Sequence, residues 1–299
     1  MNSAAMLFMS PDIPMNTDEF RLLRDFIYQY CGLNFTEDSK YLLEKRLGKR
    51  LQKHNLKNFK DYYYFLRYHP SKEQELSEVV DQLTTNETYF FREDFQLRTF
   101  VEEILPEVRE RKEREGKKSL RIWSAGCSTG EEPYTIAMLL RDQPWLSSWK
   151  VEIVGTDISQ RVLQVARQGV YGEASFRNTE EIDRLRFFTS TEDGKSRVKD
   201  EIRSLVSISH LNLFDAGRIV LLGRMDVIFC RNVIIYFDIP GKKKVIDSFF
   251  QRLLPEGYLL LGHSESLINL STDFLLRHFK HDMVYQKPLP APLGKELKK

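Results

Sequence analysis

The 299-residue chain has few cysteines, no long hydrophobic run and little net charge. Its three cysteines, Cys31, Cys127 and Cys230, form neither the even-numbered framework of a disulfide-rich protein nor the paired spacing of a zinc site. No apolar run approaches the roughly 20 residues that a membrane span needs. A formal charge of +2 argues against a generally nucleic-acid-binding surface, although it does not exclude a local basic patch. We therefore expect a cytoplasmic protein that neither inserts into a membrane nor binds nucleic acid.

The chain does have the composition of an ordinary globular protein, with 41% hydrophobic and 29% charged residues, which excludes a disordered class. Its first residues are apolar, but they lack a positively charged start and are interrupted by Pro11 and Pro14, which argues against a signal peptide. The expected organisation is a flexible leader over 1–15, an all-α domain over 16–100, a solvated helical linker over 101–119, an α/β domain over 120–287 and a flexible tail over 288–299.

After residue 120, short β-like runs alternate with amphipathic helices, which predicts a parallel, doubly wound α/β sheet. The expected strands are LRIWS, VEIVGTD, LVSISHL, MDVIFCRN and YLLLGHS, with a closing strand in DMVYQKP. The stretch before LVSISHL is too long for a simple connection, so we expect an inserted subdomain over about 170–203 with its own short strands or helix. Ligands of such sheets bind outside the carboxyl ends of the strands, and the candidate site is expected there.

The first of these strands runs into a turn, LRIWSAGCSTGEEPY, that carries two glycines followed by two acids. Gly126 and Gly130 permit backbone conformations and a close approach that a side chain would prevent, so a ligand can lie against the turn. Glu131 and Glu132 stand where a phosphate-binding turn would hold nothing acidic. Two carboxylates repel a phosphate but attract a cation, which favours S-adenosylmethionine (SAM) as the cofactor. The alternative is that both acids only stabilise the dipole of the following helix.

Polar residues also follow the second and third strands. Asp157 can accept hydrogen bonds from both ribose hydroxyls of a nucleoside, or it can cap the helix that follows. Asn212 can pair with the edge of an adenine while Leu213 covers the face of the ring. The alternative for Asn212 is a loop residue that satisfies its local backbone.

The fourth strand ends in Arg231 and Asn232, and Tyr236 lies four residues further on. Arginine and asparagine are costly to leave unpaired where a strand opens into a ligand site, which favours a binding role. Tyr236 can equally be a core aromatic residue whose hydroxyl reaches the surface.

The helical region holds a second polar group in TTNETYFFRED, where Asn86, Thr88 and Arg92 stand among aromatic residues. An arginine can hold a carboxylate with two hydrogen bonds, and an amino-acid-like cofactor presents a carboxylate. The alternative is an aromatic core patch flanked by polar caps.

The segment KYLLEKRLGKRLQK, residues 40–53, contains six basic residues and one acid. On a helix, one face would carry the basic residues Arg46, Lys49, Arg50 and Lys53. Such a face suits an acidic partner helix, and the alternative is an ordinary solvated surface.

Taken in order, TTNETYFFRE, WSAGCSTGEEPY, GTDIS, HLNLF, FCRNVIIYF and GHSES closely resemble the chemotaxis receptor methyltransferases of the CheR family, over roughly residues 17–286. The resemblance implies a Rossmann-like, doubly wound SAM methyltransferase domain with a small inserted β-subdomain, preceded by an all-α domain. It also implies methylation of glutamates on the cytoplasmic helices of methyl-accepting chemotaxis receptors, with S-adenosylhomocysteine as the product. The residues implied to contact the cofactor are Asn86, Thr88, Arg92, Glu131, Asp157, Asn212, Leu213, Arg231 and Asn232.

The same resemblance assigns roles near the reacting groups to Arg92 and Tyr236, and it places the basic helix against the acidic methylation region of the receptor. We expect a monomer without a metal. Some family members carry in the insert a loop with glycine and proline that docks a receptor's C-terminal pentapeptide, and TSTEDGKSRVKDEIR lacks that loop. We therefore expect no dependence on such a tether.

Two alternative functions stay open from the sequence. One is a methyltransferase with another substrate such as RNA, which is disfavoured because the chain lacks an Asp/Asn-Pro-Pro-aromatic motif. The other is a non-catalytic module that binds the cofactor or docks at receptor arrays.

Overall fold

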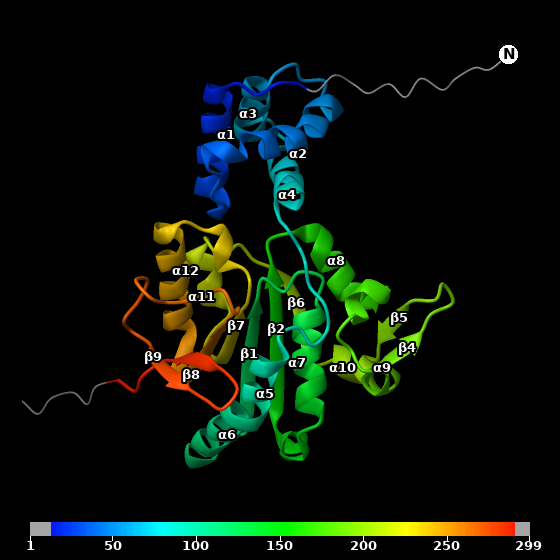
Figure 1. Cartoon of the computed structure of the whole chain (residues 1–299), viewed down its shortest axis with the longest axis vertical. Coiled ribbons are helices and arrows are strands. Elements are labelled where there is room, and N and C mark those ends of the chain that lie inside the picture. The colour runs from blue at the N-terminus through cyan, green and yellow to red at the C-terminus, as the bar shows by residue number, and fades with distance from the viewer. Residues whose placement is uncertain (1–12, 291–299) are drawn as a thin grey trace, which may run out of the picture. The chain divides into compact units, whose positions relative to one another are not determined.

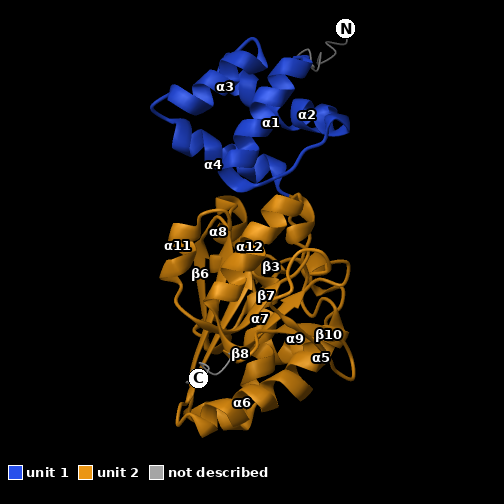
Figure 2. Cartoon of the chain, turned by 90° about the vertical axis from the view of Figure 1, so that its left-hand side faces the viewer, with its two compact units in different colours: residues 1–84 blue, residues 85–299 orange. Residues whose placement is uncertain are grey.

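The computed structural model describes residues 13–290 (Figure 1). The chain divides into two compact units, residues 1–84 and 85–299 (Figure 2). Most of the predicted leader and tail lies outside the described residues. Met15, the last residue of the predicted leader, is an exception, because it is buried and its backbone N–H donates to Glu44 over 2.9 Å. Met15 therefore packs as part of the first unit.

All the secondary-structure elements in the described part of the first unit are helices, which confirms the all-α prediction. Helix α1 starts at a capping box formed by Asn16 and Glu19, and it stops at Gly32, which has a φ of 76°. The helices bury one apolar face each, for example Leu43 and Leu47 of α2. The elements are α1 (Thr17–Cys31), η1 (Glu37–Ser39), α2 (Lys40–Lys53), α3 (Phe59–Tyr68) and α4 (Lys72–Leu83).

The boundary between the units lies at residue 84, whereas the expected all-α domain extended to residue 100. The difference arises from packing, because Phe90, Leu97 and Phe100 are buried in the core of the second unit together with strand residues. A periodic apolar pattern identifies a helix but does not tell which core its apolar face fills.

The predicted solvated linker over 101–119 is also part of the second unit, and that prediction is wrong. Helix α6 follows α5 and the π-helical η2 without a break, and its residues Arg111 and Lys112 are buried. Both cations pair with Asp226, which is itself fully buried. The elements are α5 (Asp94–Thr99), η2 (Phe100–Ile104) and α6 (Leu105–Arg114).

The second unit is built on a seven-stranded sheet in the order β6-β2-β1-β7-β8-β10-β9 (Figure 1). Strands β6, β2, β1, β7 and β8 are parallel, and β10 and β9 continue the sheet in antiparallel pairs, which confirms the Rossmann-like prediction. Strand β9 was not predicted, because its residues are largely exposed and show no apolar alternation. The strands are β1 (Ser119–Ala125), β2 (Lys150–Asp157), β6 (Val206–His210), β7 (Met225–Cys230), β8 (Leu253–Leu261), β9 (Leu275–His278) and β10 (Met283–Gln286).

Helices cover both faces of this sheet. Successive strand residues point to opposite faces, so Ile122 of β1 joins a core cluster with α6 and α7, whereas Trp123 joins a second cluster with α12. The Trp123 ring meets Phe249 of α12 edge to face, with the ring centroids 5.2 Å apart. The remaining elements are α7 (Glu131–Arg141), η3 (Pro144–Ser148), α8 (Gln160–Gln168), α11 (Ala216–Leu221), η5 (Ile234–Tyr236) and α12 (Ile239–Arg252).

The inserted subdomain is present between α8 and β6, as predicted. It contains a three-stranded antiparallel sheet in the order β3-β5-β4. Its elements are β3 (Val170–Tyr171), η4 (Glu173–Phe176), α9 (Glu181–Phe187), β4 (Phe188–Ser190), β5 (Ser196–Val198) and α10 (Asp200–Arg203).

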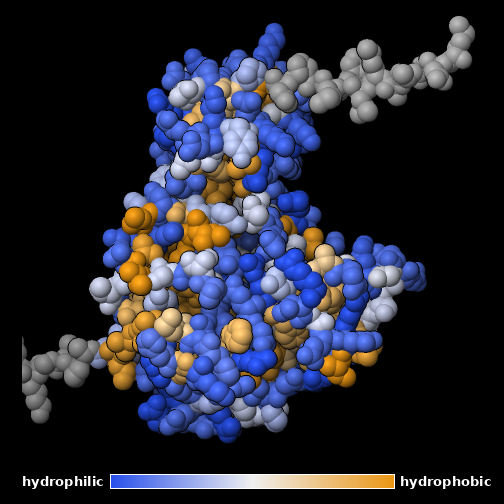
Figure 3. Space-filling model, viewed as in Figure 1, coloured by the Kyte–Doolittle hydropathy of each residue, from blue (hydrophilic) through white to orange (hydrophobic). Residues whose placement is uncertain are grey.

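The surface of the second unit is mostly hydrophilic in the view of Figure 3, with hydrophobic side chains gathered on the side where α11 and α12 lie. Leu221 at the end of α11 is 83% exposed, and Ile239 at the start of α12 is 62% exposed. Among the described residues, no helix combines the length and the apolar character that crossing a bilayer requires.

Candidate active site

The predicted site residues lie at the edge where the parallel strands end. The strand register pairs Ala125 with Thr156 and Asp157 with His210, so β1, β2 and β6 finish next to one another. The segments that leave this edge are 126–131 after β1, Asn212 and Leu213 after β6, and Arg231 and Asn232 after β7. The topology thus gathers residues that are more than a hundred positions apart in the chain.

The glycines of the turn leave room for packing within the protein. A Cβ on Gly126, which has a φ of 79°, would lie 2.4 Å from the Val233 side chain. A Cβ on Gly130, with a φ of 96°, would lie 2.8 Å from the Cβ of Ala166. The two glycines therefore lock the turn against the loop after β7 and against helix α8.

Asp157 joins the glycine turn to the end of strand β2. Its carboxylate accepts a hydrogen bond from the Ser128 backbone N–H and another from the Ser159 backbone N–H, both at 2.9 Å. The alternative role as the cap of α8 belongs to Ser159, whose side chain accepts from the N–H of Val162. Asp157 is thus a buried carboxylate oriented by the backbone at the strand end.

Glu131 is a buried carboxylate at the start of α7. The Thr129 hydroxyl donates to one of its oxygens over 2.6 Å, and the Ser175 hydroxyl donates to the other over 2.8 Å. Burial raises the pKa of Glu131, and these two hydroxyls partly offset the rise. Within residues 13–290, no lysine, arginine or histidine side chain pairs with it.

Glu132 does more than stabilise the helix dipole. It accepts a hydrogen bond from the Ser124 hydroxyl over 2.7 Å, and its other oxygen lies 3.3 Å from the Arg231 guanidinium. Burial raises the pKa of Glu132, and the nearby charge of Arg231 opposes the rise. The residue types alone do not distinguish the two glutamates. Glu131 is bonded by the glycine turn and the insert, whereas Glu132 is bonded by β1 and by the residue that follows β7.

Arg231 is engaged by protein groups, whereas the sequence analysis expected it to contact the cofactor. Its guanidinium pairs with Glu132 and with Glu93, each at 3.3 Å, and it donates to the backbone carbonyl of Arg92. The arginine side chain is 3% exposed. It therefore ties three segments together: the end of β7, the start of α7 and the loop that carries Arg92.

The loop around Arg92 has an unusual backbone. Phe91 and Glu93, on either side of Arg92, have φ values of 56° and 57°, a left-handed conformation that is costly for residues with a side chain. The Arg92 guanidinium donates to the carbonyl of Glu87 over 2.8 Å. Strain of this kind persists only where the surroundings impose it, which is typical of functional sites.

Asn86 and Thr88 lie in the same loop and are half-buried. The carbonyl of Asn86 accepts a hydrogen bond from the Ser128 hydroxyl over 3.3 Å. This contact brings the Arg92 loop next to the glycine turn.

Asn232 sits at the end of β7 with a φ of 59°. Its side-chain oxygen is buried and has no hydrogen-bond partner among the described residues. Glu265, which the sequence analysis missed, accepts from the backbone N–H groups of Asn232 and Gly262, both at 2.8 Å, and from Ile235 at 3.2 Å. Burial raises the pKa of Glu265, and the backbone hydrogen bonds act against that rise.

Glu265 thus fixes the turn that leads to Tyr236, which is half-buried in η5. The motif GHSES contains this acid, but the motif indicates no role for it, because its partners are backbone N–H groups.

Asn212 carries out the local role that the sequence analysis named as its alternative. Its side-chain oxygen accepts from the backbone N–H of Phe214 over 2.9 Å. Leu213 is 8% exposed and belongs to the core cluster on the α12 face of the sheet.

The residues at this edge fit SAM. A buried carboxylate without a cationic partner, Glu131, is costly unless a positive group neutralises it, and SAM carries two positive groups. The unpaired oxygen of Asn232 offers an acceptor to an amino or hydroxyl donor. Asp157 adds a second oriented carboxylate suited to a ribose.

Two family models match the chain. The model described as CheR methyltransferase, SAM binding domain, matches residues 86–282, and the one described as CheR methyltransferase, all-alpha domain, matches residues 18–84. The chain belongs to the CheR methyltransferase family. SAM is therefore its cofactor, and the doubly wound unit is its SAM-binding domain.

Similar proteins carry the name chemotaxis protein methyltransferase. Chemotaxis protein methyltransferase 2 of Vibrio cholerae serotype O1 is 39% identical over 93% of this chain and 95% of that protein. A chemotaxis protein methyltransferase of Borreliella burgdorferi is 38% identical over 86% of this chain and 90% of that protein. Chemotaxis protein methyltransferase 2 of Pseudomonas aeruginosa is 35% identical over 89% of this chain and 92% of that protein.

The basic helix α2 of this family member is not the open cationic face that its sequence predicted. Arg50 is buried and pairs with Glu75 at 2.5 Å and with Glu78 at 2.9 Å. Arg46 donates to the carbonyl of Leu83 over 2.7 Å. The two arginines thus join α2 to α4, whereas Lys49 and Lys53 remain exposed. The helical pattern gave the correct face but could not show that α4 supplies acids to it.

The Arg50–Glu75 pair predicts a pH-dependent stability. Burial raises the pKa of Glu75, but hydrogen bonds from Arg50, Tyr62 and His54 outweigh it, so that the net pKa is lowered. A lowered pKa contributes stability that is present above the unfolded value of about 4.3 and is lost as the pH falls through the folded value. We expect Glu75→Gln to cost about 2 kcal/mol at neutral pH and to flatten this acidic loss, measured by urea unfolding between pH 3 and 7.

The matched control is Glu78→Gln, because Glu78 pairs with the same arginine but its side chain is 41% exposed. We expect that change to cost less than about 1 kcal/mol. Equal costs for the two variants would contradict a special role for the buried pair.

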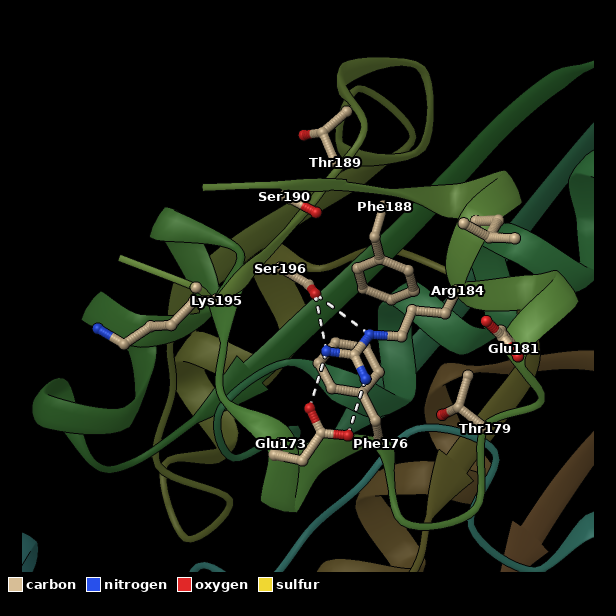
Figure 4. Close-up of a pocket in the computed structure, with 12 residues that line it drawn as sticks. Glu173, Phe176, Thr179, Glu181, Arg184, Phe188, Thr189, Ser190, Lys195 and Ser196 are labelled. Carbon is tan, nitrogen blue, oxygen red and sulfur yellow. Dashed lines mark hydrogen bonds and ion pairs between the residues drawn. The ribbon is translucent and has the colours of Figure 1, made fainter. Parts of the chain in front are cut away.

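The inserted subdomain holds a pocket of about 470 Å³ (Figure 4). Arg184 lies across the Phe176 ring, with its guanidinium carbon 4.3 Å from the ring centroid, and it donates to both carboxylate oxygens of Glu173. The residues that line this pocket include none of the predicted site residues.

Proposed function

We propose that this chain transfers the methyl group of SAM to glutamate side chains on the cytoplasmic helices of chemoreceptors, which forms glutamate methyl esters and S-adenosylhomocysteine. The observation that carries the proposal is the buried Glu131, which has two hydroxyl donors and no cationic partner in residues 13–290. The names of the relatives from Vibrio, Borreliella and Pseudomonas support chemotaxis as the context.

The chemistry needs little proton transfer. SAM supplies a methyl group that is made electrophilic by its sulfonium. A glutamate with a pKa of about 4.3 is already a carboxylate at neutral pH, so the site needs no general base. The residues of the chain therefore act by holding the two reactants in line and by excluding water from them.

The proposed roles follow from charge and position. Glu131 faces the cationic end of the cofactor, and Asp157 accepts from its ribose hydroxyls. Arg92 and Tyr236 hold the reacting groups in line, and Arg231 positions the Arg92 loop. Further cofactor contacts are proposed for Asn86, Thr88, Asn212, Leu213 and Asn232.

The receptor is proposed to meet the exposed lysines of α2. Lys49 and Lys53 remain exposed beside Arg46, and cations of this kind attract the carboxylates of an acidic helix. Arg50 is excluded from this role, because its charge is compensated by Glu75 and Glu78.

The test of the proposed function is methyl transfer from labelled SAM to receptor-containing membranes. We expect base-labile label on the receptor band, which disappears when the receptor glutamates are replaced by alanine. Label on added RNA would favour the other methyltransferase hypothesis. Tight SAM binding without transfer to any receptor would favour a non-catalytic binding or docking module.

A separate prediction concerns the tether. The segment 189–203 of the insert lacks the docking loop with glycine and proline, so we expect no binding when a tethering pentapeptide is titrated against the purified protein. We also expect equal methylation rates for receptors with and without that peptide. Binding of the pentapeptide in the micromolar range, measured by calorimetry, would contradict this prediction.

A further inference from the structure

The inserted subdomain touches two of the segments that carry the candidate site, the Arg92 loop and the start of α7. Residues 175–178 of the insert lie against the loop of Arg92 and against Glu131 at the start of α7. These contacts involve backbone and side-chain groups on both sides.

The first contact orients Glu131. The Ser175 hydroxyl donates to one carboxylate oxygen over 2.8 Å, while Thr129 of the glycine turn donates to the other over 2.6 Å. The Tyr171 hydroxyl, also in the insert, donates to the carbonyl of Thr129 over 2.7 Å. Both oxygens of the buried carboxylate thus have a fixed donor, and the insert supplies one of them directly and supports the other.

The second contact holds the Arg92 loop. The backbone N–H of Phe90 donates to the carbonyl of Ser175 over 2.9 Å, and the Asn178 amide donates to the carbonyl of Phe91 over 3.0 Å. The Phe90 ring packs against three aromatic rings of the insert at centroid distances of 4.9 to 5.3 Å, namely those of Tyr171, Phe176 and Phe188. The loop is therefore anchored in the core of the insert.

A third contact lies at the exposed rim of the same loop. The guanidinium carbon of Arg177 is 3.8 Å from the centroid of the Tyr89 ring, and Arg177 also pairs with Glu87 at 2.7 Å. Arg92 approaches the same ring at 5.7 Å. The insert thereby adds a second cation beside Arg92.

The strained backbone explains why the loop needs this support. Left-handed conformations at Phe91 and Glu93 are costly for residues with a side chain, and they persist only when surrounding contacts impose them. Arg231 holds the loop from the strand end, and Asn178 holds it from the insert.

We propose that the inserted subdomain is a positioning element of the methyl-transfer site, in which Ser175 orients Glu131 and Asn178 holds the Arg92 loop. This role needs no receptor peptide on the insert, so it applies to a family member without a tether. It rests on the proposed function only for its turnover readout, because cofactor affinity is measured without a receptor.

The two residues predict different kinetic effects. Ser175→Ala removes a hydrogen bond to a charged acceptor that faces the cofactor, so we expect about tenfold weaker binding of S-adenosylhomocysteine by calorimetry and a matching rise in KM for SAM. Ser175→Thr keeps the hydroxyl and should restore affinity. Asn178→Ala should lower kcat by about threefold to tenfold and leave the affinity for S-adenosylhomocysteine within twofold.

The matched control is Ser190→Ala, which removes an exposed hydroxyl from strand β4 of the same subdomain. We expect wild-type affinity, kcat and melting temperature for this variant. Thermal unfolding of Ser175→Ala and Asn178→Ala should also stay within a few degrees of the wild type, since each change removes a single side-chain hydrogen bond.

Wild-type affinity in Ser175→Ala, or a loss in Ser175→Ala that Ser175→Thr does not restore, would overturn the proposal. A loss of affinity in Ser175→Ala together with no methyl transfer by the wild type to any receptor would refute the proposed function while supporting the positioning role of Ser175. Normal affinity of Ser175→Ala for S-adenosylhomocysteine, together with receptor methylation by the wild type, would support the proposed function and refute the positioning role of Ser175.

Discussion

Replacing Arg92 with alanine is expected to lower methyl transfer by about 10²- to 10³-fold while changing the free energy of unfolding by less than about 1 kcal/mol. The large kinetic effect follows if the guanidinium holds a reacting carboxylate in line. The small stability effect follows from the contacts of the side chain. It is 26% exposed, and it donates to the carbonyl of Glu87 over 2.8 Å.

The backbone of the loop should survive this change. The contacts that impose the left-handed conformations involve the Phe91 N–H, which donates to the Thr135 hydroxyl, and the Arg92 carbonyl, which accepts from Arg231. Alanine retains these backbone groups. The effect should therefore appear in kcat or KM and not as a general loss of structure.

The matched control is Arg98→Ala, because Arg98 lies in the next helix, is 54% exposed and pairs with Asp94 within one turn. We expect wild-type transfer rates for it, measured with labelled SAM and receptor membranes. Normal turnover by a folded Arg92→Ala protein would contradict the proposed role of Arg92.

Replacing Asp226 with asparagine is expected to destabilise the SAM-binding unit by about 3–5 kcal/mol. Asp226 is fully buried and pairs with Arg111 and with Lys112, the latter at 2.8 Å. Its other oxygen accepts from the backbone N–H of Arg121 over 3.0 Å. Asparagine would leave two buried cations without a counter-charge. An uncompensated buried charge destabilises the folded state strongly.

The same arrangement predicts that removing one of the two cations costs much less stability than removing the charge of Asp226. One carboxylate compensates two cations, so Lys112→Met leaves a balanced pair with Arg111 and should cost less than about 1 kcal/mol. Glu113→Gln on the same helix is the surface control, since Glu113 is 48% exposed and pairs with Arg109 on the helix surface. Urea unfolding of the full chain measures all three variants, and an equal cost for Lys112→Met and Asp226→Asn would contradict the prediction.

Much of the fold follows from local patterns. Apolar runs of strand length alternate with amphipathic helices after residue 120, and this alternation predicts each parallel strand and the insert. The strand ends then bring Glu131, Asp157 and Asn232 to one edge, because parallel strands share the edge at which their carboxyl ends lie. Strand β9 was not predicted, since its four residues do not alternate between apolar and polar.

The partners of individual side chains did not follow from the sequence. Arg50 and Arg111 lie in highly charged helical segments, where the sequence pattern is typical of solvated side chains. In the structure each is buried against a carboxylate from a distant segment. Glu265 holds the Asn232 turn through backbone groups, which leave no signature in the side-chain pattern. Charge pairs and backbone hydrogen bonds depend on which segments meet in space, and a local window of sequence does not contain that information.

The sequence by itself determined the class of this protein: the helical and α/β parts, the acidic glycine turn that favours a cationic nucleoside, and the ordered motifs of the CheR family. Only the tertiary structure decided which groups each of these residues contacts. It separated Glu131, whose charge has no cationic partner in residues 13–290, from Glu132, which pairs with Arg231. It also showed that the insert contacts the Arg92 loop and Glu131. The periodicity of apolar residues indicates which face of a helix or strand is buried. Which distant polar groups contact one another depends on how the helices and strands pack.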